Sequence, residues 1–273
     1  MLLFVTEILR VYFIMPFPGS QYANTIDWAY FIEKYKWLLR ILGLMLAAGP
    51  AYRIFTQKKR LPRILLSGMI ALYGVIFFFF NFRFEADKMF YQPGIKDFAG
   101  VAGNKTDSNK LVIGIEINGE SRAYPIQIIG YHHQVKDTVG NTPVMVTYCT
   151  VCRTGRVYSP LINGKPETFR LAGMDHFNAM FEDETTKSWW QQATGVAIAG
   201  PLKGYHLEEI PSRQASLASW IRDHPNSTIL QPDSNFKKDY DDLAGFDKGT
   251  VKSHLEKRDS ASWKMKSWIV GIK

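Results

Sequence analysis

The chain has 273 residues, of which 46% are hydrophobic and 21% are charged, and its formal net charge at pH 7 is +8. Part of the positive charge lies in one short segment, and elsewhere Lys and Arg are interspersed with Asp and Glu, so no basic stripe indicates a nucleic-acid partner. The length allows a membrane region followed by one domain with a sizeable core.

Two apolar stretches lie near the start of the chain, at Trp37–Phe55 and Ile64–Phe82. Each has roughly the 20 residues that a helix needs to cross a bilayer. The segment between them, Thr56–Arg63, is short and basic, and such loops stay in the cytoplasm. We therefore predict an integral membrane region over residues 1–83, with both outer ends of the helical hairpin on the far side of the membrane.

The opening stretch, Leu2–Phe17, is apolar but contains Glu7 and Arg10 at helical spacing. It lacks the basic start and the small-residue cleavage site of a signal peptide. Our preferred interpretation is a third span with a Glu7–Arg10 pair inside it, and the alternative is an amphipathic helix at the membrane surface. Both interpretations place the C-terminal domain outside the cytoplasm.

Residues 92–273 are predicted to form one β-rich exported domain, so the expected fold class is α+β with an N-terminal transmembrane helical region. Asn118-Gly119 is typical of a hairpin turn between two strands. One segment, Leu217–Asp223, is clearly helical, with Ser216 as its cap. Residues 231–262 are polar and are expected to form a long surface loop. Strands are expected at Lys110–Ile117, Glu120–Tyr124, Pro143–Tyr148, Arg153–Ser159, Glu167–Leu171, Asn178–Glu182 and Ser188–Gln192.

The last residues of the chain, Ser267–Lys273, repeat the pattern of Leu111–Glu116 and stop where a hairpin would begin. Either a final strand closes the sheet there, or the sequence is truncated.

The two cysteines of the chain form the motif Cys149-Thr-Val-Cys152 between two β-branched and aromatic segments. No helical pattern follows, so the helix N-terminus that activates a thioredoxin-type pair is not expected. Arg153 stands where the attachment of c-type haem needs His, which excludes haem. No Gly-rich phosphate loop indicates a nucleotide. We therefore predict a tight turn that presents two sulfurs to one metal ion, Zn or Cu.

Four sequence segments are specific in combination: Gly119–Pro125, Tyr131–Asp137, Val146–Cys152, and Ser188–Gly195 leading to Gly200-Pro201. Together they resemble the bacterial family catalogued as domain of unknown function 3179. The resemblance covers nearly all of the exported domain and none of the membrane region. The family usually has Glu after its histidine and Pro within C-x-x-C, where this chain has His133 and Thr150. A bacterial family implies the inner membrane, with the C-terminal domain on the periplasmic side.

The resemblance places the family's histidine at His132. Two thiolates and one imidazole would make a three-ligand metal site with a fourth position for water, substrate or another side chain. His176 is the candidate for that fourth ligand, and Met174 is the softer alternative if the ion is Cu(I). The alternative at both histidines is an ordinary structural side chain.

Three functions remain open from the sequence. The first is a structural or catalytic metal centre at Cys149, Cys152 and His132. The second is a thiol–disulfide redox protein in which Cys149 attacks, Cys152 resolves, and Arg153 stabilises a thiolate. The third is a disulfide-stapled interaction domain without catalysis. The substrate, a small molecule or a protein, is not indicated.

Overall fold

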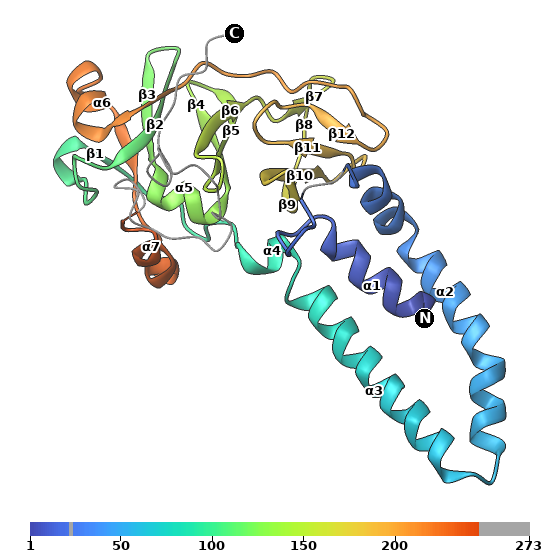
Figure 1. Cartoon of the computed structure of the whole chain (residues 1–273). Coiled ribbons are helices and arrows are strands. Elements are labelled where there is room, and N and C mark those ends of the chain that lie inside the picture. Colours follow the sequence, from blue (N-terminus) through green and yellow to red (C-terminus); the bar gives the residue numbers. More distant parts are fainter. Residues whose placement is uncertain (22–23, 246–273) are drawn as a thin grey trace, which may run out of the picture. The chain divides into compact units, whose positions relative to one another are not determined.

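The computed structural model describes residues 1–21 and 24–245, which fall into two compact units (Figure 1). Unit 1 comprises Met1–Phe90, Phe169–Gln191 and Val196–Tyr205. Unit 2 comprises Tyr91–Thr168, Gln192–Gly195 and the described residues from His206 onward. The range predicted for the exported domain therefore contributes to both units, while the α+β fold class is confirmed.

Unit 1 contains two long helices, α2 (Ile26–Thr56) and α3 (Arg60–Phe82), which run side by side and are joined by a short loop (Figure 1). Their most apolar 18-residue windows have mean hydropathies of 1.4 and 2.1, and only 11% and 0% of those windows are buried inside the protein. A helix that is apolar and exposed on most sides suits lipid better than water. By length and composition, both helices could cross a membrane.

Helix α1 (Leu2–Tyr12) has 11 residues, which is too short for a membrane span. The helix ends at Tyr12 and is shorter than the predicted stretch Leu2–Phe17, and the third span stays a prediction. The expected Glu7–Arg10 pair is also replaced by contacts to other helices. Arg40 of α2 donates two hydrogen bonds of 2.7 Å to the Glu7 carboxylate, and Arg10 pairs with Glu33 and Glu85.

Asn81 of α3 connects these ion pairs. Its Nδ2 donates to Glu7 at 2.9 Å, while its Oδ1 accepts from Arg10 at 3.0 Å and from Arg40 at 2.7 Å. Charged groups in an apolar setting are stable only when they are paired and hydrogen-bonded. The network therefore fixes α1 against α2 and α3, and Arg40 is buried in it.

Unit 1 also contains a four-stranded antiparallel sheet with the order β12-β11-β10-β9. The amide of Met174 in β9 donates to the carbonyl oxygen of Ile14 at 2.7 Å, and Tyr30 of α2 packs edge-on against Trp189 of β11. This sheet therefore packs on the helical region, although its sequence lies in the predicted exported domain. The remaining elements of unit 1 are β9 (Phe169–Asp175), β10 (Asn178–Asp183), β11 (Trp189–Gln191), β12 (Ala197–Ala199) and α4 (Ala86–Met89).

Unit 2 has a five-stranded sheet with the order β1-β14-β3-β2-β13, and α6 (Leu217–Asp223) covers it. Trp220 of α6 lies so close to Gly114 that a Cβ at this glycine would be 2.3 Å from the indole ring. Val112 and Leu217 complete the centre of this core. The strands are β1 (Phe98–Gly100), β2 (Leu111–Ile117), β3 (Glu120–Pro125), β13 (Arg213–Ser216) and β14 (Thr228–Leu230).

A second sheet of unit 2 has the order β4-β5-β6 and carries the cysteines. Helix α5 (Ile126–His132) precedes this sheet and lies close to β5 and the loop after it. The closeness is visible at Gly130, where an added Cβ would lie 3.1 Å from Thr150 and 3.9 Å from Tyr148. The remaining elements are β4 (Gln134–Val139), β5 (Thr142–Cys149), β6 (Thr154–Tyr158), β7 (Leu161–Ile162), β8 (Lys165–Pro166), η1 (Val101–Gly103), η2 (Ser234–Phe236) and α7 (Lys237–Asp242).

Several local predictions are confirmed. Asn118 and Gly119 have φ values of 51° and 82°, as a tight hairpin turn requires, and the Ser216 hydroxyl caps α6 by accepting from the Ser219 amide at 3.2 Å. The prediction of a single helix in this region is wrong, because α5 and α7 are also present, and η2 and α7 interrupt the expected long loop. The predicted final strand, Ser267–Lys273, lies outside the described residues.

Candidate functional site

The C-x-x-C motif lies in the hairpin between β5 and β6, as the sequence predicts. Cys149 is the last residue of β5 and pairs with Thr154, the first residue of β6. The four residues between them form the loop, and Arg153 takes the left-handed conformation, with φ of 54°, that lets the chain enter β6. The hairpin geometry therefore brings both cysteines to one side of a short loop.

The two sulfur atoms lie 2.9 Å apart. Two thiolates on one tetrahedral Zn ion, each at 2.3 Å, would be separated by about 3.8 Å, whereas a disulfide bond is about 2.05 Å long. The Cys152 amide also points at the Cys149 sulfur, at 3.5 Å. An N–H donor favours negative charge on sulfur, and both metal ligation and nucleophilic attack use the thiolate.

The two thiols differ in their exposure to solvent. Cys149 is 1% exposed, at the end of a strand whose last six residues are all buried. Cys152, at the outer side of the loop, is exposed. An external reagent or protein therefore reaches Cys152 first.

Gln192 connects the two strands of the hairpin next to the cysteine loop. Its Nε2 donates to the Thr147 hydroxyl at 2.9 Å and to the Thr154 carbonyl at 3.0 Å, and the Thr147 hydroxyl donates to the Arg156 carbonyl at 2.9 Å. Gln192 is completely buried, so these bonds form away from competing water. The sequence gives no periodic signal for this role, because Gln192 lies far along the chain, just after β11.

His132, the predicted third metal ligand, uses both ring nitrogens in hydrogen bonds. Nδ1 contacts the carbonyl oxygen of Tyr91, and Nε2 lies 2.6 Å from the Tyr240 hydroxyl. A carbonyl oxygen only accepts, so Nδ1 carries the proton and neutral Nε2 accepts from Tyr240. The lone pair that a metal would need is therefore already engaged.

The surroundings of His132 keep its ring neutral. The ring is fully buried and meets Tyr131, Phe236 and Tyr240 edge-on, with centroid distances of 5.0 to 5.6 Å. Burial lowers the pKa of His132 and raises the pKa of Tyr240, because both charged forms would lose their hydration. This is the environment of a structural histidine.

His133 and His176 each have contacts of their own. His133 ends α5 with φ of 62°, and its Nδ1 lies 3.0 Å from the Tyr131 carbonyl oxygen. Burial lowers the pKa of His133 to about 4. His176 belongs to unit 1, where it is exposed in the turn after β9 and contacts Asp175 at 2.8 Å. Within the described part of the chain, no group of three or more His, Cys, Asp or Glu side chains could hold a metal ion.

The cysteine hairpin thus supplies two sulfur donors, and the metal site predicted at Cys149, Cys152, His132 and His176 stays a prediction. Residues 93–273 match the model of a family described as a protein of unknown function, DUF3179. The chain belongs to the DUF3179 family. No curated protein and no solved structure matches the chain. The DUF3179 range begins after α4 and includes the cysteine hairpin, Gln192, and both partners of the His132–Tyr240 hydrogen bond.

Proposed function

We propose that this DUF3179 protein is a membrane-anchored thiol–disulfide exchange protein that uses Cys149 and Cys152. The observation that supports it best is the pair of sulfurs at 2.9 Å, one buried and one exposed, on the β5–β6 hairpin. Exchange needs one accessible thiol and one neighbour that can reach the same sulfur atom. Cys152 and Cys149 meet these two requirements, and exchange, unlike a metal centre, needs no further side chain as a ligand.

The exposure of the two thiols favours the order opposite to that expected from the sequence. The Cys152 thiolate attacks one sulfur of a disulfide substrate, which forms a mixed disulfide and releases the other substrate sulfur as a thiolate. The Cys149 thiolate then attacks the Cys152 sulfur, which releases the second substrate thiolate and closes the Cys149–Cys152 disulfide. The substrate gains two electrons and the protein loses two, and the reverse sequence oxidises a dithiol substrate.

The proposed location follows from the membrane helices. The basic loop Thr56–Arg63 joins α2 and α3, and such loops stay in the cytoplasm, so the DUF3179 region would follow the hairpin on the opposite side. In a bacterium this is the periplasmic face of the inner membrane. That compartment is oxidising, which makes a neighbouring pair of thiols competent for exchange and prone to oxidation.

The two alternative functions make different demands on the same hairpin. A Zn or Cu centre would need further donors from a partner or from residues outside the described range, with the two sulfurs moving apart. A structural disulfide would need no accessible thiolate at all. The same set of measurements separates these three possibilities.

The test uses the full chain in detergent, purified without reductant, together with the variants Cys149→Ser and Cys152→Ser. We expect Cys149→Ser to form a lasting mixed disulfide with glutathione disulfide, because Cys152 is exposed and the resolving thiol is missing. Cys152→Ser, the matched control, should react slower by about tenfold or more, because Cys149 is buried. Intact-mass spectrometry over time measures both adducts.

The wild-type protein supplies the outcomes that would contradict the proposal. Exchange predicts a reversible disulfide with a potential between about −270 and −120 mV. A potential below about −300 mV would favour the structural disulfide. Stoichiometric Zn or Cu with both thiols protected would favour the metal centre. Faster trapping at Cys149 than at Cys152 would reverse the assigned roles.

A further inference from the structure

A pocket of about 440 Å³ lies in unit 1, where the first part of α2 and the start of α4 meet β9, β10 and the turn after β10. Pockets of roughly 300 to 1,000 Å³ are typical of small-molecule sites. Charged side chains dominate its lining: four carboxylates and four cationic groups. This composition is unlike that of a core defect, which would be apolar and closed.

Each acidic group of this pocket has a cationic partner. Glu33 binds Lys36 at 2.6 Å and Arg10 at 3.1 Å, and Glu85 binds Arg10 at 2.8 Å. Arg170 binds Glu182 at 2.9 Å and approaches Asp87 at 3.7 Å.

The cationic groups are not all neutralised. Lys34 and Lys187 also line the pocket, and neither makes an ion pair within the part of the chain that the structure describes. The lining as a whole carries equal numbers of carboxylates and cationic groups, and these two lysines are its cations without an ion pair among the described residues, so they are available to contact an anion.

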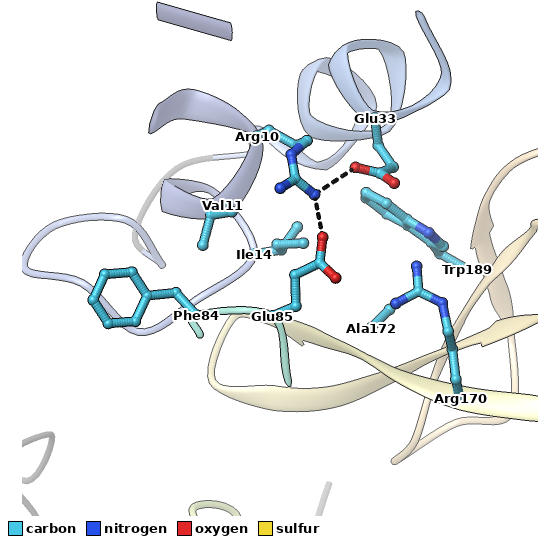
Figure 2. A pocket seen from close by; sticks show the side chains of 9 residues that line it. All are labelled: Arg10, Val11, Ile14, Glu33, Phe84, Glu85, Arg170, Ala172 and Trp189. Atoms are coloured by element: carbon cyan, nitrogen blue, oxygen red, sulfur yellow. Dashed lines mark hydrogen bonds and ion pairs between the residues drawn. The ribbon is translucent and has the colours of Figure 1, made fainter. Parts of the chain in front are cut away.

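The pocket shares part of its lining with a small cavity beside the buried guanidinium of Arg10. Glu33, Glu85 and Arg170 also line this small cavity, which Arg10 and Trp189 close (Figure 2). Its volume of about 10 Å³ suits one water molecule or one ligand oxygen. Arg10 is 2% exposed, and its Nε has no hydrogen-bond partner among the described residues.

The pocket lies at the level of a membrane surface if α2 and α3 cross the bilayer. Tyr30 to Lys36 precede the predicted span Trp37–Phe55, and Glu85 and Asp87 follow the predicted span Ile64–Phe82. Both groups are therefore at the hairpin end remote from the basic loop. Exposed aromatic side chains flank this level on α2, as is typical of helices at the membrane–water interface: Trp28, Phe31, Tyr35 and Trp37.

We propose that this pocket binds the phosphodiester headgroup of an anionic phospholipid, with Lys34 and Lys187 holding the phosphate. The proposal rests on the membrane anchoring proposed above and is independent of the thiol chemistry. The ligand source is the surrounding bilayer, which presents phosphates at this depth. A soluble phosphate compound would share the chemistry but not the location.

The test measures binding of dioctanoyl phosphatidylglycerol to the full chain in detergent by native mass spectrometry. We expect the double variant Lys34→Gln/Lys187→Gln to bind about thirtyfold more weakly, because each lysine near a phosphate contributes about a factor of five. The matched control is Lys58→Gln/Lys59→Gln, which removes the same charge from the loop at the other end of the hairpin and should bind as the wild type does.

Three results would overturn the proposal. Equal loss of affinity in both double variants would show that the lipid is attracted to the protein's overall positive charge and not to this pocket. Equal binding of dioctanoyl phosphatidylcholine would show that the anionic headgroup is not recognised. Saturable binding of glycerol 3-phosphate with equal affinity would make the ligand a soluble phosphate. Failure of the wild-type chain to float with liposomes would instead contradict the membrane anchoring, so the two failures are distinguishable.

Discussion

At the scale of single residues, His132 is held between the Tyr91 carbonyl oxygen and the Tyr240 hydroxyl. Tyr240→Phe removes the hydroxyl and leaves Nε2 as a buried acceptor without its donor. We expect a loss of about 1–3 kcal/mol in unfolding free energy, measured by chemical denaturation of the full chain in detergent. The reactivity of Cys152 should not change, because His132 is not assigned to the cysteine pair.

The control for this prediction is Tyr91→Phe. Tyr91 binds His132 through its main-chain carbonyl, and its side chain is half exposed, so the variant keeps the hydrogen bond. Equal destabilisation by both variants would indicate that aromatic packing, and not the hydroxyl, supports His132. A change in thiol reactivity or metal content in Tyr240→Phe would return His132 to the candidate site.

His133 gives a pH dependence with a definite sign. Burial lowers its pKa from 6.5 to about 4, so the folded protein keeps this ring neutral where the unfolded chain is protonated. Stability should therefore be full above pH 6.5, should fall as the pH drops towards 4, and should level off below 4. The predicted contribution is on the order of 3 kcal/mol over this interval, from about 1.4 kcal/mol for each pKa unit.

The matching variant is His133→Asn. Asn tolerates the left-handed conformation at this position and does not titrate, so the decline of stability between pH 6.5 and 4 should become shallower. Unfolding midpoints at several pH values measure this slope. An unchanged slope would assign the acid sensitivity to other groups, of which His132 is the first candidate because burial also lowers its pKa.

At the scale of the elements, α6 and β2 are fitted to each other at Gly114. A methyl group there would meet the Trp220 ring at 2.3 Å, and Trp220 is fixed by its own bond to Ser227 at 2.8 Å. We expect Gly114→Ala to lower the unfolding free energy by about 2–3 kcal/mol through overpacking. Gly100→Ala, where nothing lies within 4 Å, should stay within about 0.5 kcal/mol. Similar denaturation curves for both variants would contradict this packing.

The sequence predicts those elements whose signals are local. The Asn118-Gly119 turn needs only its own two residues, and α6 combines an amphipathic pattern with an adjacent Ser216 cap. Helix α5 is missed because six of its seven residues are buried, so it has no polar face to reveal a helical period. The short strands β1 and β14 depend on pairing with each other, more than a hundred residues apart.

In the candidate site too, the features set by neighbouring residues can be predicted, and those set by distant residues cannot. The C-x-x-C turn is predictable, because both strands and the loop lie within about fifteen residues of sequence. The role of His132 cannot be predicted from the sequence, because it depends on a hydrogen bond with Tyr240, which is 108 positions away along the chain. The exposure of Cys152 and the burial of Cys149 also come from the packing of β5 and not from the motif.

At the scale of the whole molecule, sequence order and compact units do not coincide. The sheet β9–β12 follows the cysteine hairpin in sequence but packs on the helical region in unit 1. Contacts from the first 90 residues hold it, among them the Ile14 carbonyl on Met174, Tyr30 on Trp189, and the Gln21 side chain on the Phe177 amide. A hydropathy pattern shows where the membrane helices end, but not that a later sheet returns to them.

A fragment that begins at Tyr91 should therefore be only partly stable. Without residues 1–90, β9 loses the acceptor for Met174, and the fully buried Trp189 loses Tyr30. We expect the amides of β10 to exchange with solvent at least about tenfold faster in the fragment than in the full chain, because local opening sets these rates and about 1.4 kcal/mol corresponds to a factor of ten. Amides of β2, whose partners are all in unit 2, serve as the internal control and should keep their protection. Equal protection of β10 in both proteins would show that the sheet folds without the helical region, and that the exported domain predicted from the sequence is one independent folding unit.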